Sequence, residues 1–278
     1  MAISRRRVFL RVAESWLHTA VSLLAMTLVM GVAVALASRF GGARVVIGIL
    51  MGVFSTSLVM FILSEVVITT LFRAVKPDPV KHGRFIAAVS KVWRGRLFSP
   101  RLYVVEMGVP NAFAFGMGFL GQYGIAISQE LYDLLDHEEL EGVVAHEVGH
   151  IKCKDVGLMT VIQIITGGAE QLANLVLKGS TALGSTPLAY VLGWSLKLFS
   201  RFIFPMGKSA ISQEREFAAD ALAALYTGTT RGLRRALEKL SAAAESRTQS
   251  RKEEMFSDLF ISHPKMAKRL AALSSLEE

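Results

Sequence analysis

Two long apolar runs near the amino terminus constrain this chain more than any other feature. No Asp, Glu, Lys or Arg occurs from Trp16 to Ser38 or from Val45 to Ser64, and a short segment, Arg39 to Arg44, separates the runs. About 20 helical residues cover the hydrocarbon core of a bilayer, which is roughly 30 Å thick. We therefore expect a transmembrane hairpin over residues 1–72, with spans at 16–38 and 45–64 and a turn at Arg39–Arg44. A buried soluble hairpin and a cleaved signal peptide both fit less well, because soluble helices and signal sequences rarely stay uncharged for so long.

The composition supports a membrane protein. Hydrophobic residues make up 52% of the 278-residue chain and charged residues 19%, with a mean hydropathy of +0.43. These values exclude intrinsic disorder. The chain has one cysteine, Cys153, so an internal disulfide and a cysteine-rich metal site are excluded as well. A metal site in this chain must use histidines and carboxylates.

The positions of the basic residues predict the orientation in the membrane. Lys and Arg cluster before the first run and after the second, whereas the turn between them has only Arg39 and Arg44. The positive-inside rule then places the amino terminus and everything after Leu71 in the cytoplasm. The formal net charge of +8 is explained by anionic lipid headgroups at the membrane surface, and we expect no nucleic-acid partner. The clustered residues are Arg5, Arg6, Arg7 and Arg11 on one side and Arg73, Lys76, Lys81, Arg84 and Lys91 on the other.

A helix with metal-binding spacing follows in the part of the chain that reads as soluble. Asp136 and Glu139 have the spacing of a capping box, and an apolar stripe continues to Ile151. On this helix His146 and His150 are four residues apart and lie on one face, so both imidazoles can bind one zinc ion. Glu147 can then reach a water on that metal. Gly149 lowers the helix propensity of this segment without a local reason, and it lies at a point where a ligand could need room.

A hydrolytic zinc site needs a third protein ligand and an open position. The sequence offers another histidine or a carboxylate. Glu216 and Asp220 are four residues apart in a stretch with good helix propensity, so they share a face. Glu216 could bind the metal while Asp220 accepts the spare N–H of a ligand histidine. The alternative is a solvated acidic face with Arg215 as its partner.

These motifs, taken in order, resemble the integral-membrane zinc endopeptidases of the bacterial HtpX type, which are related more distantly to the type 1 CAAX prenyl endoprotease. The resemblance covers nearly the whole chain. It rests on the two amino-terminal runs, Pro110 to Ala114, Ala145 to His150, Arg215 to Asp220, and Ser262-His263-Pro264 followed by Arg269. It implies zinc bound by His146, His150 and Glu216, with Glu147 as general base. Asp220 would be hydrogen-bonded to one of the ligand histidines without binding the metal itself.

The same resemblance implies further roles. Asn111, Ala112 and Phe113 would lie along an edge strand that pairs with the substrate backbone, which is a way of binding unfolded or extended chains. His263 and Arg269 would help to stabilise the oxyanion, although Ser262 and Pro264 equally suit the start of a helix. Gln213 stands where an arginine is common in the family.

Residues 155–205 form a second apolar segment that interrupts the peptidase domain, whose parts we expect at 73–154 and 206–278. The segment carries Glu170, Lys197 and Arg201, each costly at a bilayer centre. It therefore either spans the membrane as a hairpin or lies at its surface. Because His150 and Glu216 must meet at one metal, the chain between them crosses the membrane twice or not at all.

The predicted fold is mainly α-helical with a small β-sheet, in which a gluzincin-like peptidase domain centred on the His146–His150 helix accompanies the membrane hairpins. The predicted function is zinc-dependent cleavage of misfolded or damaged membrane proteins, by a multi-pass enzyme of a prokaryotic cytoplasmic membrane. A non-catalytic zinc-binding scaffold or sensor, and a processing protease with one specific substrate, are the alternatives.

Overall fold

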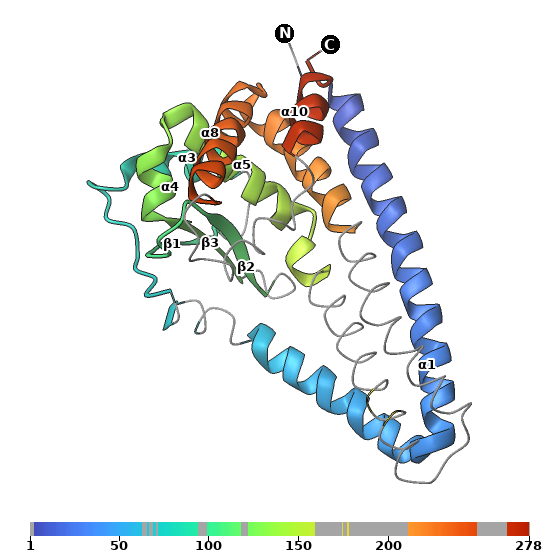
Figure 1. The fold of residues 1–278 in the computed structure, drawn as a ribbon. Helices are drawn as coiled ribbons and strands as arrows, with labels where there is room; N and C mark the ends of the chain where they lie inside the picture. Colours follow the sequence, from blue (N-terminus) through green and yellow to red (C-terminus); the bar gives the residue numbers. More distant parts are fainter. Residues whose placement is uncertain are drawn as a thin grey trace. The chain divides into compact units, whose positions relative to one another are not determined.

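The computed structural model describes residues 3–62, 66, 69–70, 72–93, 99–117, 122–158, 174, 177, 211–248 and 266–277. Within these residues the protein is mostly helical with one small sheet, as the sequence predicts (Figure 1). Contacts divide the chain into two compact units. One unit comprises Met1–Trp16, Ile62–Gly157 and Ser212–Glu278, and the other comprises Leu17–Phe61 and Leu158–Ile211.

The first helix, α1 (Arg5–Ile62), contains the two amino-terminal apolar runs as far as Ile62. The turn predicted at Arg39–Arg44 is wrong, because these residues stay helical. Figure 1 shows that α1 instead bends sharply along its length. Gly41 and Gly42 stand between the runs, and a pair of small residues without proline allows a helix to bend without ending. Among the described residues, one segment of α1, Arg5–Ala25, is long and apolar enough to cross a membrane.

The sheet has three strands, β1 (Arg101–Val105), β2 (Ala112–Met117) and β3 (Gln122–Ser128), in the order β1-β3-β2. Leu102 to Val105 and Gly124 to Ile127 are strand-like stretches in the sequence, and the structure places both in strands. β1 and β3 are parallel, and β2 pairs antiparallel with β3, with Phe113 opposite Ala126. In the described part of the chain, β2 has a strand neighbour on one side only.

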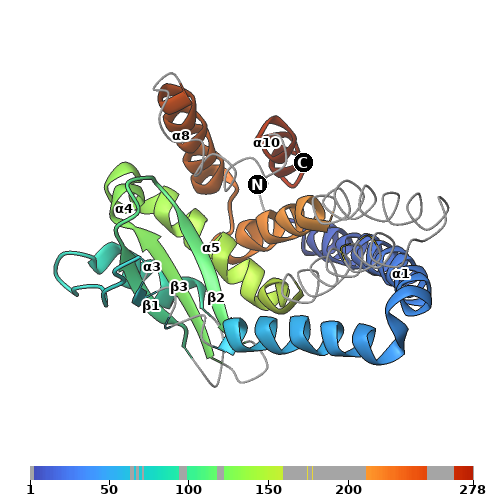
Figure 2. The same ribbon diagram turned by 60° about the horizontal axis from the view of Figure 1, so that its bottom comes forward.

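The helix that carries His146 and His150 is α5 (His137–Lys152), and it packs against the sheet and two helices (Figures 1 and 2). Its neighbours are β2, α3 (Gly83–Val92) and α8 (Arg231–Thr248). The predicted capping box is confirmed: the Asp136 side chain accepts from the Glu139 N–H at 2.9 Å, and the Glu139 carboxylate accepts from the Asp136 N–H at 2.9 Å. The short helix α4 (Gln129–Leu134) precedes it and is capped by Ser128.

Two glycines of α5 are explained by close helix packing. A Cβ at Gly149 would lie 3.0 Å from the backbone of Ala219, and one at Gly142 would lie 2.5 Å from the Leu233 nitrogen. The interpretation of Gly149 as room for a ligand is therefore wrong. Its missing side chain lets α5 approach the helix of residues 211–227, which carries Glu216 and Asp220.

The carboxyl-terminal helix α10 (Met266–Ser274) belongs to the same unit as α5. Arg7 donates to the carbonyl oxygen of Ser275 at 2.5 Å, so the two ends of the chain lie together. The Thr230 N–H donates to the Glu277 carboxylate at 3.0 Å, and the Thr230 hydroxyl bonds to the same oxygen. These contacts hold α10 in a defined position, with Arg269 buried.

Candidate metal centre

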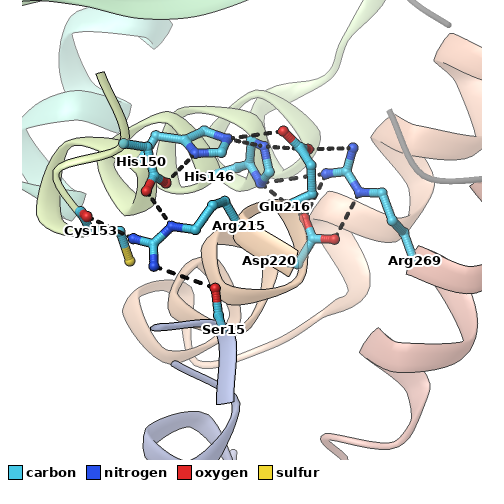
Figure 3. Close-up of polar contacts among 9 residues, drawn as sticks. Ser15, His146, His150, Cys153, Arg215, Glu216, Asp220 and Arg269 are labelled. Atoms are coloured by element: carbon cyan, nitrogen blue, oxygen red, sulfur yellow. Dashed lines mark hydrogen bonds and ion pairs between the residues drawn. The ribbon is translucent and has the colours of Figure 1, made fainter. Parts of the chain in front are cut away.

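The structure brings His146, His150 and Glu216 together. One potential ligand atom from each lies within 4.8 Å of the other two. The two Nε2 atoms are 3.0 Å apart, and each lies 3.3 Å from a different oxygen of Glu216. Figure 3 shows the imidazoles of α5 and the carboxylate from the helix of residues 211–227 turned toward one another.

Each histidine has its other nitrogen against a carboxylate. Nδ1 of His146 lies 2.9 Å from Asp220, and Nδ1 of His150 lies 2.7 Å from Asp155. Because a carboxylate accepts, we assign the ring proton to Nδ1 in both residues, which leaves each Nε2 with its lone pair facing the centre. Two lone pairs and a carboxylate at this separation repel unless a cation or protons lie between them.

The donor set fits a zinc ion. Two imidazole nitrogens and a carboxylate oxygen are ligands that zinc takes in catalytic sites, and tetrahedral bonds of about 2.0–2.1 Å put ligand atoms about 3.3 Å apart. The observed separations of 3.0, 3.3 and 3.3 Å are close to that spacing. Asp220 and Asp155, which contact the Nδ1 atoms, would raise the basicity of the two histidines as metal ligands and fix the orientation of their rings.

The charges around the centre shift the histidine pKa values. Burial alone would lower the pKa of His146, but the hydrogen bonds to Asp220 and Glu216 outweigh it and the pKa is raised. Burial acts in the same direction on His150, where Asp155, Glu216 and the charge of Glu147 hold the pKa well above its ordinary value. The surrounding carboxylates therefore favour positive charge at this centre.

Arg269 of α10 supports the His146 side of the centre. Its Nε and Nη2 lie 2.8 and 2.6 Å from the two oxygens of Asp220, and its Nη1 lies 3.0 Å from Glu216 (Figure 3). Burial tends to raise the pKa of Asp220, but the charge and hydrogen bonds of Arg269 lower it overall. The structure thus places Arg269 as a residue that orients Asp220 and Glu216. His263 lies outside the described residues, as do Glu170, Lys197 and Arg201.

Glu147 is 7% exposed and follows His146 on α5. Its charge acts on both His150 and Arg269, so its carboxylate lies near the centre. Asn111 accepts a backbone hydrogen bond from Ser128 at 2.8 Å, immediately before β2, and Ala112 and Phe113 begin that strand. The predicted substrate-contacting residues therefore lie at the edge strand that packs against α5.

Asp155 and Arg215 were not singled out as site residues from the sequence. Arg215 donates to Asp155 and to the carbonyl oxygen of Cys153, the latter at 2.6 Å. The only signal in the sequence is an acidic residue five positions after His150, beyond the end of its helix. Cys153 itself is buried, and burial raises the pKa of its thiol to about 11.

The geometry is that of a metallopeptidase: two histidines one helical turn apart, a carboxylate ligand from a second helix, and a buried glutamate beside them. Comparison with known proteins gives the family. Residues 87–277 match Peptidase family M48, and the chain belongs to that family. It is therefore a metalloprotease, a hydrolase, and this favours the enzyme over the non-catalytic scaffold.

Curated relatives agree with the family. The chain is 33% identical over 217 residues to a "Protease HtpX homolog" from Aeropyrum pernix, covering 74% of this chain and 68% of that protein. A protein of the same name from Thermoplasma volcanium is 30% identical over 265 residues, covering 84% and 85%. Another from Acidiphilium cryptum is 30% identical, covering 79% and 83%. The predicted HtpX-type resemblance is confirmed.

A solved structure supports the fold. The crystal structure of S. mikatae Ste24p superposes with a TM-score of 0.56 at 18% identity, covering 94% of this chain and 66% of that chain.

Proposed function

We propose that this metalloprotease is a zinc-dependent membrane endopeptidase that cleaves unfolded or extended polypeptides. The observation that carries the proposal is the cluster of His146, His150 and Glu216, in which both histidines present Nε2 to a common centre because Asp220 and Asp155 occupy the Nδ1 atoms. A zinc ion held there would supply Lewis-acid chemistry, which polarises a carbonyl and makes a water more acidic.

Glu147 is the general base in this proposal. Its carboxylate takes a proton from the water as the oxygen forms a bond to the scissile carbonyl carbon. The same proton then passes from Glu147 to the amine nitrogen as the C–N bond breaks. Burial of Glu147 excludes bulk water from this transfer and keeps the carboxylate next to the reacting atoms.

Substrate backbone would add to the edge of β2. In an antiparallel pair, residues alternate between those bonded to the partner strand and those directed away from it. Because Asn111 bonds to Ser128, the alternation directs the backbone N–H and C=O groups of Ala112, Ala114 and Gly116 away from β3. Main-chain hydrogen bonds at this edge would select extended chains with little regard for sequence.

Membrane attachment follows from the apolar segment of α1. Arg5–Ala25 meets the length and hydropathy of a span, and exposed apolar side chains such as Phe9, Leu17 and Leu24 suit a lipid environment. Arg5, Arg6 and Arg7 at its start would contact anionic headgroups on the cytoplasmic side. We propose a multi-pass protein of a prokaryotic cytoplasmic membrane that removes misfolded or damaged membrane proteins.

The test compares Glu147→Gln with Glu141→Gln in the full chain purified in detergent. Both substitutions remove a buried carboxylate from α5, but Glu141 pairs with Lys91 at 2.8 Å and lies outside the centre. We expect Glu147→Gln to lower the cleavage of casein about 10²- to 10⁴-fold while zinc content is retained. Glu141→Gln should keep most of the activity.

Full activity of Glu147→Gln with zinc bound would contradict the mechanism. A wild-type protein that retains zinc, leaves casein intact and cleaves a single cellular protein would favour the processing protease over general quality control.

A further inference from the structure

Arg215 is fully buried, which is rare for an arginine side chain. Its exposed fraction is 0%, so it does not lie on the solvated acidic face that was the alternative for this helix. A buried guanidinium is costly unless its donors are matched. Here they are: Nε bonds to Asp155, Nη2 donates to the Cys153 carbonyl oxygen at 2.6 Å, and Nη1 donates to the Ser15 hydroxyl at 3.4 Å (Figure 3).

Asp155 links Arg215 to the metal centre. One of its oxygens bonds to Arg215, and the other lies 2.7 Å from Nδ1 of His150. The carboxylate is therefore held from both sides and has little freedom to rotate. Because the proton on Nδ1 decides that Nε2 of His150 has a free lone pair, the orientation of Asp155 affects how well this histidine binds a metal.

The backbone between these residues is shaped for the same contact. α5 ends at Lys152, and Lys154 adopts a left-handed conformation with φ of 58°. This reverses the chain so that Asp155 returns toward His150. The Cys153 carbonyl, which lies in the same turn, accepts the second hydrogen bond from Arg215. One guanidinium thus holds both the turn and the carboxylate.

The remaining contacts of Arg215 come from the beginning of α1. Ser15 is 1% exposed, and the Trp16 ring lies with its centroid 4.1 Å from the Arg215 guanidinium carbon. Such a cation–π contact stabilises the guanidinium in that place. These two residues belong to the segment Arg5–Ala25, the candidate membrane span. The route from α1 to His150 therefore consists of consecutive contacts: Ser15 and Trp16 with Arg215, Arg215 with Asp155, and Asp155 with His150.

We propose that Arg215 is a positioning residue that sets the metal affinity of His150 through Asp155. Ser15 and Trp16 then make this affinity depend on whether the beginning of α1 is packed against Arg215. The proposal rests on the proposed metal site. It predicts that displacement of α1 from Arg215 weakens metal binding although no residue of α1 is a ligand. The position of the candidate membrane helix would then regulate the loading of the enzyme.

The experiment measures the zinc dissociation constant of the full chain in detergent, by competition with a chromophoric chelator, together with the visible absorption spectrum of the cobalt-substituted protein. We expect Arg215→Met to weaken zinc binding about 10- to 100-fold and to shift the cobalt bands. Arg215→Lys keeps the charge without the fork of donors and should fall between wild type and Arg215→Met. Ser15→Ala combined with Trp16→Leu should weaken binding about 3- to 10-fold.

Arg235→Met is the matched control. It removes an arginine that bonds to Asp136 at 2.7 Å on the surface between α8 and α5, far along the helix from the histidines. Its zinc affinity should equal that of wild type, so that a loss in the Arg215 variants cannot come from a general loosening of α5.

Wild-type zinc affinity in both Arg215→Met and the Ser15→Ala, Trp16→Leu variant would overturn the proposal. Where Arg215→Met fails to fold, Asp155→Asn and the α1 variant decide it by the same criterion. His146→Ala distinguishes the role of Arg215 from the metal site itself. If zinc is lost in His146→Ala but zinc affinity is unchanged in Arg215→Met, the role of Arg215 is rejected and the metal site stands. If zinc is retained in His146→Ala, the metal site is rejected.

Discussion

The two sides of the metal centre are built alike but supported by opposite ends of the chain. On one side His146 contacts Asp220, which Arg269 of α10 holds. On the other side His150 contacts Asp155, which Arg215 holds beside α1. On each side a histidine contacts a carboxylate, and that carboxylate contacts an arginine. The centre is thus fixed by segments near the amino and carboxyl termini, which also contact each other through Arg7 and Ser275.

The two sides differ in how many ligands they hold. Arg269 contacts the ligand Glu216 directly and the ligand His146 through Asp220, so it orients two ligands. Arg215 acts on one ligand, His150, through Asp155. Arg215 also contacts the turn at Cys153 and the beginning of α1. Within the described residues, Arg269 has no counterpart of these contacts. Loss of the Arg269 contacts should therefore disturb metal binding more, and loss of the Arg215 contacts should disconnect the metal centre from α1.

The largest expected effect follows from this difference. Arg269→Met should weaken zinc binding about 100-fold, more than Asp155→Asn, for which we expect about 10-fold. The reason is that Arg269→Met leaves Asp220 and Glu216 as neighbouring buried carboxylates without their common cation. Isothermal titration or chelator competition on the purified full chain measures both values. Equal affinities in the two variants would show that the sides are equivalent.

A smaller effect is expected at the start of α5, where a carboxylate supports backbone instead of a histidine. The hydrogen bond from the Glu139 N–H lowers the pKa of Asp136 below its ordinary value. A lowered folded-state pKa means that this stabilisation is present above about pH 4 and is lost as the pH falls through the folded value. Asp136→Ala should cost about 1 kcal/mol of unfolding free energy at pH 7.

The difference between Asp136→Ala and wild type should shrink below pH 4, as measured by denaturant unfolding in detergent, and zinc affinity at pH 7 should not change. A zinc affinity that falls as much as in Asp155→Asn would mean that α5 transmits any local loss of order to the centre. The contrast between carboxylates that position ligands and those that cap helices would then fail.

The smallest effect concerns the turn that the Arg215 side requires. Lys154 has a φ of 58°, a conformation that costs a residue with a side chain roughly 1–2 kcal/mol and costs glycine much less. Part of that gain is cancelled by the greater freedom of glycine in the unfolded chain. Lys154→Gly should therefore raise the unfolding free energy by about 0.5 kcal/mol, with zinc affinity unchanged, and thermal unfolding followed by circular dichroism would detect it. A loss of stability would show that the lysine side chain holds the turn.

The sequence predicted the three ligands and the carboxylate that contacts His146, but it missed the carboxylate and the arginine that support His150, and the reason is physical. Spacing on a helix reports which residues share a face, so His146 with His150 and Glu216 with Asp220 could be paired before their positions were known. Asp155 lies past the end of α5, and its direction depends on the left-handed Lys154. No helical periodicity describes that geometry. For Arg215 the sequence offers only the alternative of a partner for a solvated acidic face, because nothing in its local sequence indicates burial.

The fold shows a similar division. The capping box of Asp136, the helical stripe after it and the short strands were all visible as local patterns. Gly41 and Gly42 indicated a break between two helices, but glycine permits a bend as readily as an end. Gly149 was assigned to ligand access because its close approach to Ala219 is a tertiary contact, which one sequence does not display.

The most direct test of the account is zinc analysis of the purified wild-type protein beside His146→Ala, His150→Ala and Glu216→Ala. We expect one zinc per chain in wild type and, at submicromolar free zinc, little or none in each variant, because a site with three protein ligands and an open position cannot lose one of them. Glu141→Gln, which alters α5 outside the centre, should retain its zinc. Normal zinc in His146→Ala and Glu216→Ala would contradict the assignment of the metal centre.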